Sequence, residues 1–270
     1  MKIPLCWVAR TLQENGSEIH FKAGGNTPAE AEAELERKIA IYRRCMAGDF
    51  SAKPKETADY AQPICEEVCD TLDEHNLVTR NRYGALVLNS EDLLFLDVDL
   101  VSHTFGELVR SIFGLAVPDA KTRLLAKIER LRQKPPYQGL AVRVYETKAG
   151  FRLLLAKPGL QTLNSPGMDR IFSDFDADLL YAELCRKQQC FRARLTPKPA
   201  RIKMTTARKF RFPYAEADRE AMAAWLAEYE KKSADYAVCR LIAQIGKKFT
   251  SPAIEYHDRM TKADRHLPLA

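Results

Sequence analysis

The chain has 270 residues, of which 46% are hydrophobic and 29% charged, and its formal net charge is +6. This composition is ordinary for a globular protein with a hydrophobic core. No stretch approaches the roughly 20 apolar residues of a membrane span, and no apolar run long enough for a signal peptide occurs before Arg10 and Glu14. We therefore expect a cytoplasmic protein with no membrane partner.

The first third of the chain has predominantly helical signals. A weakly alternating segment at 3–9 suggests a strand. Thr27-Pro28-Ala29-Glu30 forms a capping box that predicts a helix to about residue 46. A linker is expected over 48–58, and Ile64, Val68 and Leu72 predict a second helix over 60–75.

The middle of the chain is rich in predicted strands. The apolar runs 85–88 and 93–101, separated by turn residues, predict a β-hairpin, and 141–147 with 151–156 predict another around Lys148-Ala149-Gly150. A further strand is expected at 191–195. Between and after these strands, helices are predicted over 104–114, 119–133, within 166–187, and 216–245.

This order predicts an α+β fold: a mainly antiparallel sheet with flanking helices and a helical C-terminal tail. We expect an N-terminal, mainly helical region at 1–80, an α+β core at 81–215 and a C-terminal helical region at 216–270. The seven cysteines have scattered spacings with no CxxC pair, so reduced thiols are expected rather than a zinc site.

Positive charge is concentrated in one part of the chain. Residues 184–215 contain ten Lys or Arg and no acid, while the rest of the chain has 32 basic against 36 acidic residues. A positive field on a mildly acidic body predicts an anionic partner, such as nucleic acid or nucleotide phosphates.

Asp97 and Asp99 end an apolar strand and are the sharpest candidate for chemistry. Residues i and i+2 of a strand point to the same face, so the two carboxylates project together. Because like charges this close repel, a hard cation such as Mg²⁺ or Mn²⁺ would stabilise them. The alternative is a structural pair of acids neutralised by arginines from neighbouring strands.

A second acidic group lies at Asp174, Asp176 and Asp178. Asp176 is the preferred third metal ligand of this group, whereas Asp178 is suited to cap the following helix. Asp174 remains an alternative ligand.

Several cations are candidates for phosphate binding. Lys148 and Arg152 flank a hairpin turn whose Gly150 allows close approach of a ligand. Arg192 and Arg194 share a strand face, and Lys198 follows in a turn, so all three can line a phosphate groove.

The order of these pieces, over about residues 85–200, resembles the archaeo-eukaryotic primase superfamily of primase-polymerases. Leu94-Phe95-Leu96-Asp97-Val98-Asp99 matches that family's hhhDhD/E strand. Lys148-Ala149-Gly150-Phe151-Arg152 stands at its Ser-x-His hairpin, Asp176 or Asp178 at its third acid, and the segment from Phe191 to Lys198 at its basic strand and turn.

The resemblance implies an RRM-like catalytic sheet and two-metal nucleotidyl transfer with Mg²⁺ or Mn²⁺. It implies Asp97, Asp99 and Asp176 as catalytic metal ligands, and Lys148, Arg152 and Arg192 as triphosphate ligands. The partners would be a nucleoside triphosphate and nucleic acid. The sequence departs from the family at Arg152, where the family has a nucleotide-binding histidine.

Two other functions remain open. One is a non-catalytic nucleic-acid-binding protein with a degenerate primase-like core, in which the basic stretch binds and the acids are structural. The other is a phosphohydrolase of the haloacid dehalogenase type, which also has a DxD strand. A doubly wound parallel sheet would favour the phosphohydrolase, and an antiparallel sheet with Asp97 and Asp99 facing Arg152 and Arg192 would favour the primase-like protein.

Overall fold

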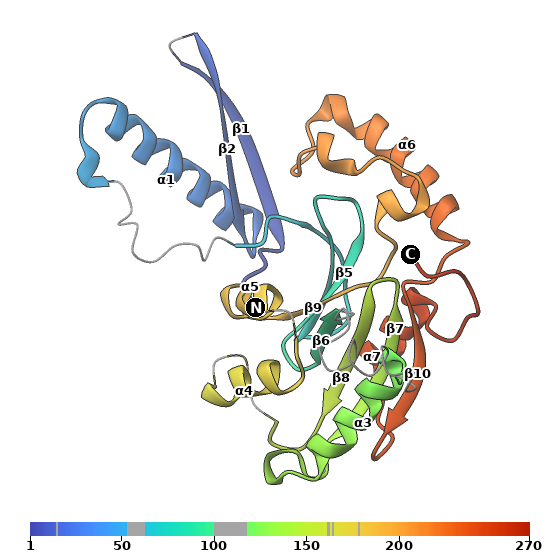
Figure 1. Cartoon of the computed structure of the whole chain (residues 1–270). Coiled ribbons are helices and arrows are strands. Elements are labelled where there is room, and N and C mark those ends of the chain that lie inside the picture. Colours follow the sequence, from blue (N-terminus) through green and yellow to red (C-terminus); the bar gives the residue numbers. More distant parts are fainter. Residues whose placement is uncertain (15, 53–62, 100–117, 161–162, 164, 178) are drawn as a thin grey trace, which may run out of the picture.

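The structure is a computed structural model of the chain, and it describes residues 1–14, 16–52, 63–99, 118–160, 163, 165–177 and 179–270. At the N-terminus, strands β1 (Cys6–Glu14) and β2 (Ser17–Gly25) form an antiparallel hairpin. Helix α1 (Pro28–Met46) packs on it and is capped as predicted, since the Thr27 side chain accepts from the Glu30 N–H. In Figure 1 this hairpin and α1 project from the rest of the molecule.

A four-stranded sheet follows, with order β3-β4-β5-β9 and antiparallel pairing throughout; we call it the β9 sheet. Its strands are β3 (Glu67–Thr71), β4 (Asn76–Arg80), β5 (Leu86–Ser90) and β9 (Phe191–Arg194). The predicted helix over 60–75 is therefore wrong. Ile64, Val68 and Leu72 are spaced by four, a period that fits one face of a strand as well as one face of a helix. The expectation of a mainly helical region at 1–80 is likewise wrong, because four strands lie within it.

The second four-stranded sheet, which we call the DxD sheet, has the order β10-β7-β8-β6 and is also antiparallel. Its strands are β6 (Leu94–Asp99), β7 (Ala141–Thr147), β8 (Gly150–Ala156) and β10 (Cys239–Ile245). The β7–β8 hairpin is confirmed. The predicted hairpin between 85–88 and 93–101 is wrong, since β5 and β6 belong to different sheets. The Ser90 hydroxyl accepts from the Asp92 and Leu93 N–H groups, and the chain changes sheets at this turn.

The helices agree with the sequence over most of their length. They are α3 (Ala120–Arg132), α4 (Pro166–Asp174), α5 (Leu179–Gln188), α6 (Glu216–Ser233) and α7 (Pro252–Thr261), with short 3-10 turns at Phe50–Ala52, Pro135–Tyr137, Pro199–Ile202 and Ala207–Lys209. The helix predicted over 104–114 lies outside the described residues. The helix predicted over 216–245 ends at Ser233, because residues 239–245 instead extend the DxD sheet as β10. The C-terminal segment is therefore not only a helical tail.

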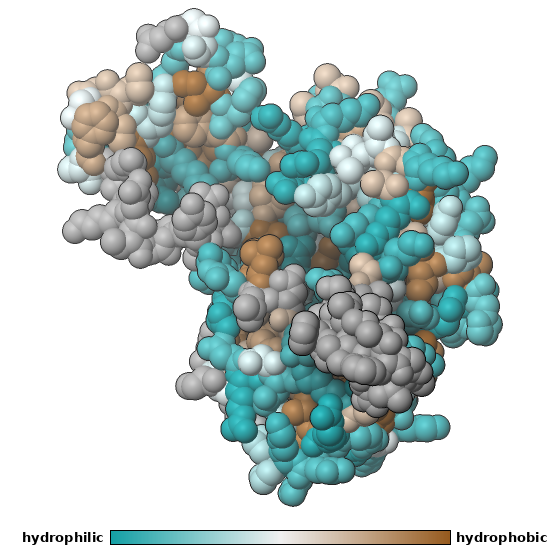
Figure 2. Space-filling model, in the orientation of Figure 1, coloured by the Kyte–Doolittle hydropathy of each residue, from teal (hydrophilic) through white to brown (hydrophobic). Residues whose placement is uncertain are grey.

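The main core lies between the sheets and their helices. Leu96, Val144 and Leu153, from three strands of the DxD sheet, are fully buried together with Ile128 of α3 and Ile254 of α7. The α+β class with mainly antiparallel sheets is confirmed, and the parallel sheet that a haloacid dehalogenase fold requires is not formed by the described strands. Within the described part of the chain, no helix is long and apolar enough to cross a membrane. The face in Figure 2 is largely hydrophilic over α6, and its apolar residues show as small separate groups.

Gly84, in the turn between β4 and β5, fixes α6 against the β9 sheet. Its φ of +95° favours glycine, and a Cβ there would overlap the Trp225 ring and lie 3.1 Å from the Ala207 Cβ. Trp225 in turn stacks on Tyr229 with a ring-centroid distance of 4.9 Å. Glycine at this position therefore allows Trp225 of α6 to pack closely against the β4–β5 turn.

We predict that Gly84→Ala lowers the free energy of unfolding by about 3 kcal/mol or more, from backbone strain and steric overlap together. Gly139→Ala is the matched control: its φ is +77°, but no atom of the described residues beyond its two chain neighbours lies within 4 Å of the added Cβ. Strain alone should then cost about 1–2 kcal/mol. Urea denaturation of both variants measures the difference, and equal losses would show that the contact with Trp225 is unimportant.

Candidate functional site

The DxD carboxylates lie at the end of β6, as the sequence predicts. Asp97 is paired with Arg152 of β8, and Asp99 with Gly150. The Asp97 side chain is 43% exposed and Asp99 is exposed, so solvent reaches both. Because they are two residues apart in a strand, the carboxylates share one face.

Arg152 is the charged centre of this face. Its side chain is 2% exposed, its Nε donates to the Asp97 Oδ1 at 3.0 Å, and its guanidinium also donates to the Arg194 carbonyl oxygen at 3.0 Å. Burial opposes the charge, but the Asp97 carboxylate outweighs it and holds the Arg152 pKa above its ordinary value. Arg152 therefore neutralises Asp97 and joins the DxD sheet to β9.

The structure does not bring Asp176 to this pair. Asp176 has a φ of +52° and forms an ion pair with Lys127 of α3 at 2.5 Å. Asp174 accepts from the Tyr137 hydroxyl at 2.6 Å, and Asp178 lies outside the described residues. Among the residues that the structure describes, no group of three or more His, Cys, Asp or Glu side chains is arranged to hold a metal ion.

Two of the predicted phosphate-binding cations make no described contact with Asp97. Arg192 forms an ion pair with Glu66 at 2.5 Å, and Glu66 also accepts from the Thr79 hydroxyl at 2.6 Å. The charge of Arg192 is therefore compensated next to the β9 sheet. Lys148 is exposed in the β7–β8 turn.

The remaining predicted cations gather near Asp97. They are Arg152, Arg194 and Lys198; with Arg201, whose charge acts on Arg194 and Lys198, we call them the basic cluster. Burial, followed by the positive charge of Arg152, lowers the pKa of Arg194 to about 10. The charge of Arg194, followed by burial and then Arg201, lowers the pKa of Lys198, while the Asp97 carboxylate partly opposes the shift in both groups. The cations thus lie close enough to repel one another around Asp97.

A buried donor in the basic cluster has no partner in the described part of the chain. The Nε of Arg194 is buried and has no hydrogen bond to any described residue. Leaving a buried donor unsatisfied costs free energy, and this cost is larger for a charged group. An anion that accepted this hydrogen bond would satisfy the donor and relieve the repulsion.

The loop that contains Lys198 is anchored by α6. The Tyr229 hydroxyl lies 2.6 Å from the Pro197 carbonyl oxygen and 2.8 Å from the Thr196 hydroxyl, which accepts from the Leu86 N–H. Next to it, the guanidinium groups of Arg82 and Arg208 lie 5.0 and 5.2 Å from the centre of the Tyr83 ring. The positive surface therefore continues from the basic cluster to the β4–β5 turn.

A buried polar network behind Arg152 was missed at the sequence level. His257 and Asp258 of α7 meet Arg143 and Tyr145 of β7: the Tyr145 hydroxyl and the Arg143 guanidinium donate to Asp258, and His257 lies 3.4 Å from the Arg152 guanidinium. Each side chain is ordinary in its local sequence, and no spacing rule links residue 257 to residue 152.

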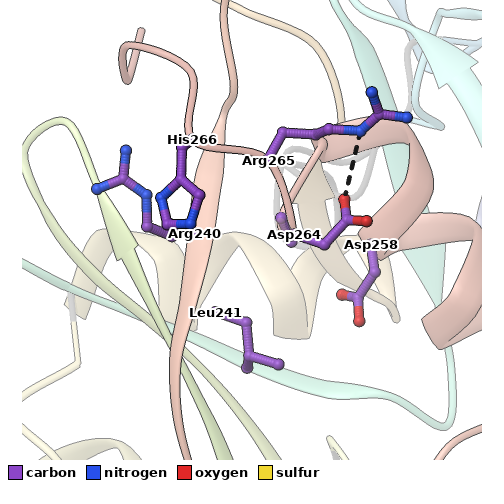
Figure 3. Close-up of a pocket in the computed structure, with 7 residues that line it drawn as sticks. Arg240, Leu241, Asp258, Asp264, Arg265 and His266 are labelled. Atoms are coloured by element: carbon purple, nitrogen blue, oxygen red, sulfur yellow. Dashed lines mark ion pairs between the residues drawn. The ribbon is translucent and has the colours of Figure 1, made fainter.

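The pocket in Figure 3 lies at the other end of this network, between β10 and α7, and has a volume of about 220 Å³. None of the predicted site residues lines it. The guanidinium groups of Arg240 and Arg265 point away from each other there, so they do not converge on one ligand.

Comparison with known proteins finds no matching family model, no matching curated protein and no matching solved structure.

We predict that wild-type stability falls as the pH is lowered from about 7 to 5, because of His257. Burial, outweighing the attraction of Asp258, lowers the pKa of His257, so the unfolded chain binds a proton that the folded protein does not. Stability therefore rises with pH, with a slope of at most about 1.4 kcal/mol per pH unit for one group. Urea denaturation at a series of pH values should show a flatter profile for His257→Gln, and identical profiles would contradict the prediction.

Proposed function

We propose that this protein binds nucleic acid or nucleotide phosphates at the basic cluster, as a non-catalytic protein with a degenerate primase-like core. The observation that carries the proposal is the buried Arg194 Nε, which has no partner among the described residues and lies among three other cations. On this proposal the DxD sheet is the RRM-like sheet of that core.

The charge balance supports an anionic ligand. Three cations, Arg152, Arg194 and Lys198, lie close enough to interact with the Asp97 carboxylate, whose Oδ1 already accepts from Arg152. Arginine and lysine side chains presented together are the usual ligands of phosphate groups. The basic stretch 184–215 and the Arg82–Tyr83–Arg208 group extend the positive surface, and a chain of phosphates can follow it.

The described carboxylates are poorly suited to a two-metal centre. Such a centre needs carboxylates that are free to share two cations, whereas Asp97 is bound to a buried guanidinium and Asp176 to Lys127. This arrangement is better suited to holding an anion than to activating a hydroxyl group.

Metal-dependent nucleotidyl transfer is the second candidate function. It is favoured by one observation: Asp97 and Asp99 share a strand face, and both are reached by solvent. Mg²⁺ or Mn²⁺ would be the cofactor, with a nucleoside triphosphate as substrate.

We predict that Arg194→Met weakens binding to single-stranded oligonucleotides about tenfold, through loss of one charge-assisted hydrogen bond. The slope of log affinity against log salt should fall by about 0.7. Stability should be unchanged or about 1 kcal/mol higher, because a repelled and unsatisfied donor is removed. Fluorescence anisotropy with DNA and RNA oligomers, together with urea denaturation, measures both effects.

Lys121→Met is the matched control, because it removes an exposed lysine of α3 outside the basic stretch. It should leave oligonucleotide affinity nearly unchanged. If Arg194→Met binds like wild type, or if both variants weaken binding equally, the basic cluster is not the binding site.

Calorimetry with Mn²⁺ separates the two candidate functions. On our proposal, a nucleoside triphosphate binds without metal, and Mn²⁺ alone binds wild type no better than Asp97→Asn/Asp99→Asn, because Arg152 occupies Asp97. Tight Mn²⁺ binding that requires the triphosphate and is lost in the double variant would instead support nucleotidyl transfer, and primer extension would follow.

A further inference from the structure

His257 is enclosed in the core beside the basic cluster. Its side chain is fully buried, and its ring lies between Phe95 of β6 and Tyr145 of β7, with both ring-centroid distances at 5.1 Å. A buried imidazole needs a hydrogen-bond partner on each nitrogen, so those partners determine its state.

The two ring nitrogens face opposite kinds of partner. Nδ1 lies 3.0 Å from Asp258 Oδ1, and Nε2 lies 3.4 Å from the Arg152 guanidinium. A carboxylate only accepts hydrogen bonds and a guanidinium only donates them. Both contacts therefore require the same neutral tautomer, with the proton on Nδ1 and a lone pair on Nε2.

Hydrogen bonds from two side chains of β7 fix the position of the Asp258 carboxylate. It accepts from the Tyr145 hydroxyl at 2.8 Å and from the Arg143 guanidinium, and Arg143 also donates to Tyr145 at 2.7 Å. Asp258 lines the pocket in Figure 3, where its side chain is 23% exposed. The network thus runs from that pocket through Asp258 and His257 to Arg152.

The Arg152 guanidinium faces hydrogen-bond acceptors on three separate elements. They are the Asp97 carboxylate of β6, the Arg194 carbonyl of β9 and the His257 ring of α7. Since the guanidinium is planar and its donors are fixed in direction, three acceptors define its orientation.

We propose that His257 is a positioning residue that, as the Nδ1–H tautomer, orients the Arg152 guanidinium. Arg152 in turn fixes the positions of the Asp97 carboxylate and of Arg194, where the basic cluster begins. His257 touches no ligand itself. Its effect on ligand affinity rests on the proposed function, whereas the tautomer and the orientation of Arg152 do not.

Nitrogen NMR of the ¹⁵N-labelled full chain tests the tautomer directly. We expect His257 to show a protonated Nδ1 and an unprotonated Nε2, unchanged between pH 6 and 8. The Arg152 Nε–H should give a resonance that exchanges slowly with water. A protonated Nε2, or a charged ring over this range, would overturn the inference.

Two conservative variants separate positioning from packing. In His257→Gln the side-chain oxygen can replace Nε2 and still accept from Arg152. In His257→Asn the amide can replace Nδ1–H but offers no acceptor to Arg152. We expect Asn, but not Gln, to speed exchange of the Arg152 Nε–H and to weaken oligonucleotide binding about fivefold.

Thr261→Val is the control for helix packing, because the buried Thr261 hydroxyl donates to the His257 carbonyl at 2.7 Å and does not contact Arg152 in the described hydrogen bonds. It should lower stability but leave affinity and the Arg152 resonance unchanged. If Asn behaves like Gln and Thr261→Val, positioning is refuted. If wild type binds no oligonucleotide, the proposed function fails, while the two NMR readouts still decide the role of His257.

Discussion

Arg152 places a permanent positive charge at the junction of two sheets, and much of the candidate site depends on how that charge is compensated. Taking a guanidinium out of water is costly unless its donors meet well-placed acceptors. Asp97, the Arg194 carbonyl and His257 supply them from β6, β9 and α7. The contact with the Arg194 carbonyl joins the DxD sheet to the β9 sheet, so the charge that needs neutralising also fixes where the basic loop after β9 begins.

The compensation is local and leaves an excess of positive charge. Asp97 balances Arg152, but Arg194 and Lys198 then repel each other, and burial adds to the cost of charging Arg194. Arg192 differs, because Glu66, next to β3, forms an ion pair with it. Two arginines two residues apart on the same strand thus have opposite surroundings. The unbalanced one faces Asp97 and the loop, which is why we assign anion binding to that side.

Local sequence predicted those elements whose periodicity had a single interpretation. The capping box at Thr27 and the alternating β7–β8 hairpin are examples, and the i, i+2 spacing correctly placed Asp97 and Asp99 on one face of β6. Ile64, Val68 and Leu72 misled because a spacing of four suits either a helix or a strand. The pairing of β5 and β6 with different sheets depends on partners more than 50 residues away, which no local pattern specifies.

The candidate site, like the fold, could be predicted from the sequence only where local patterns determine it. Asp97 opposite Arg152 is part of the arrangement that the primase-like interpretation required, but the role of Arg194 depends on burial and that of His257 on the docking of α7. On the proposal of a degenerate primase-like core, this difference bears on Arg152, where the proposed family has a histidine. A histidine at position 152 would titrate near neutral pH and leave Asp97 largely free for a cation. Arginine is always charged, so it keeps Asp97 engaged, and the imidazole is supplied instead from α7 on the buried side. On our proposal, this exchange of positions converts a face suited to metal ions into one suited to phosphate.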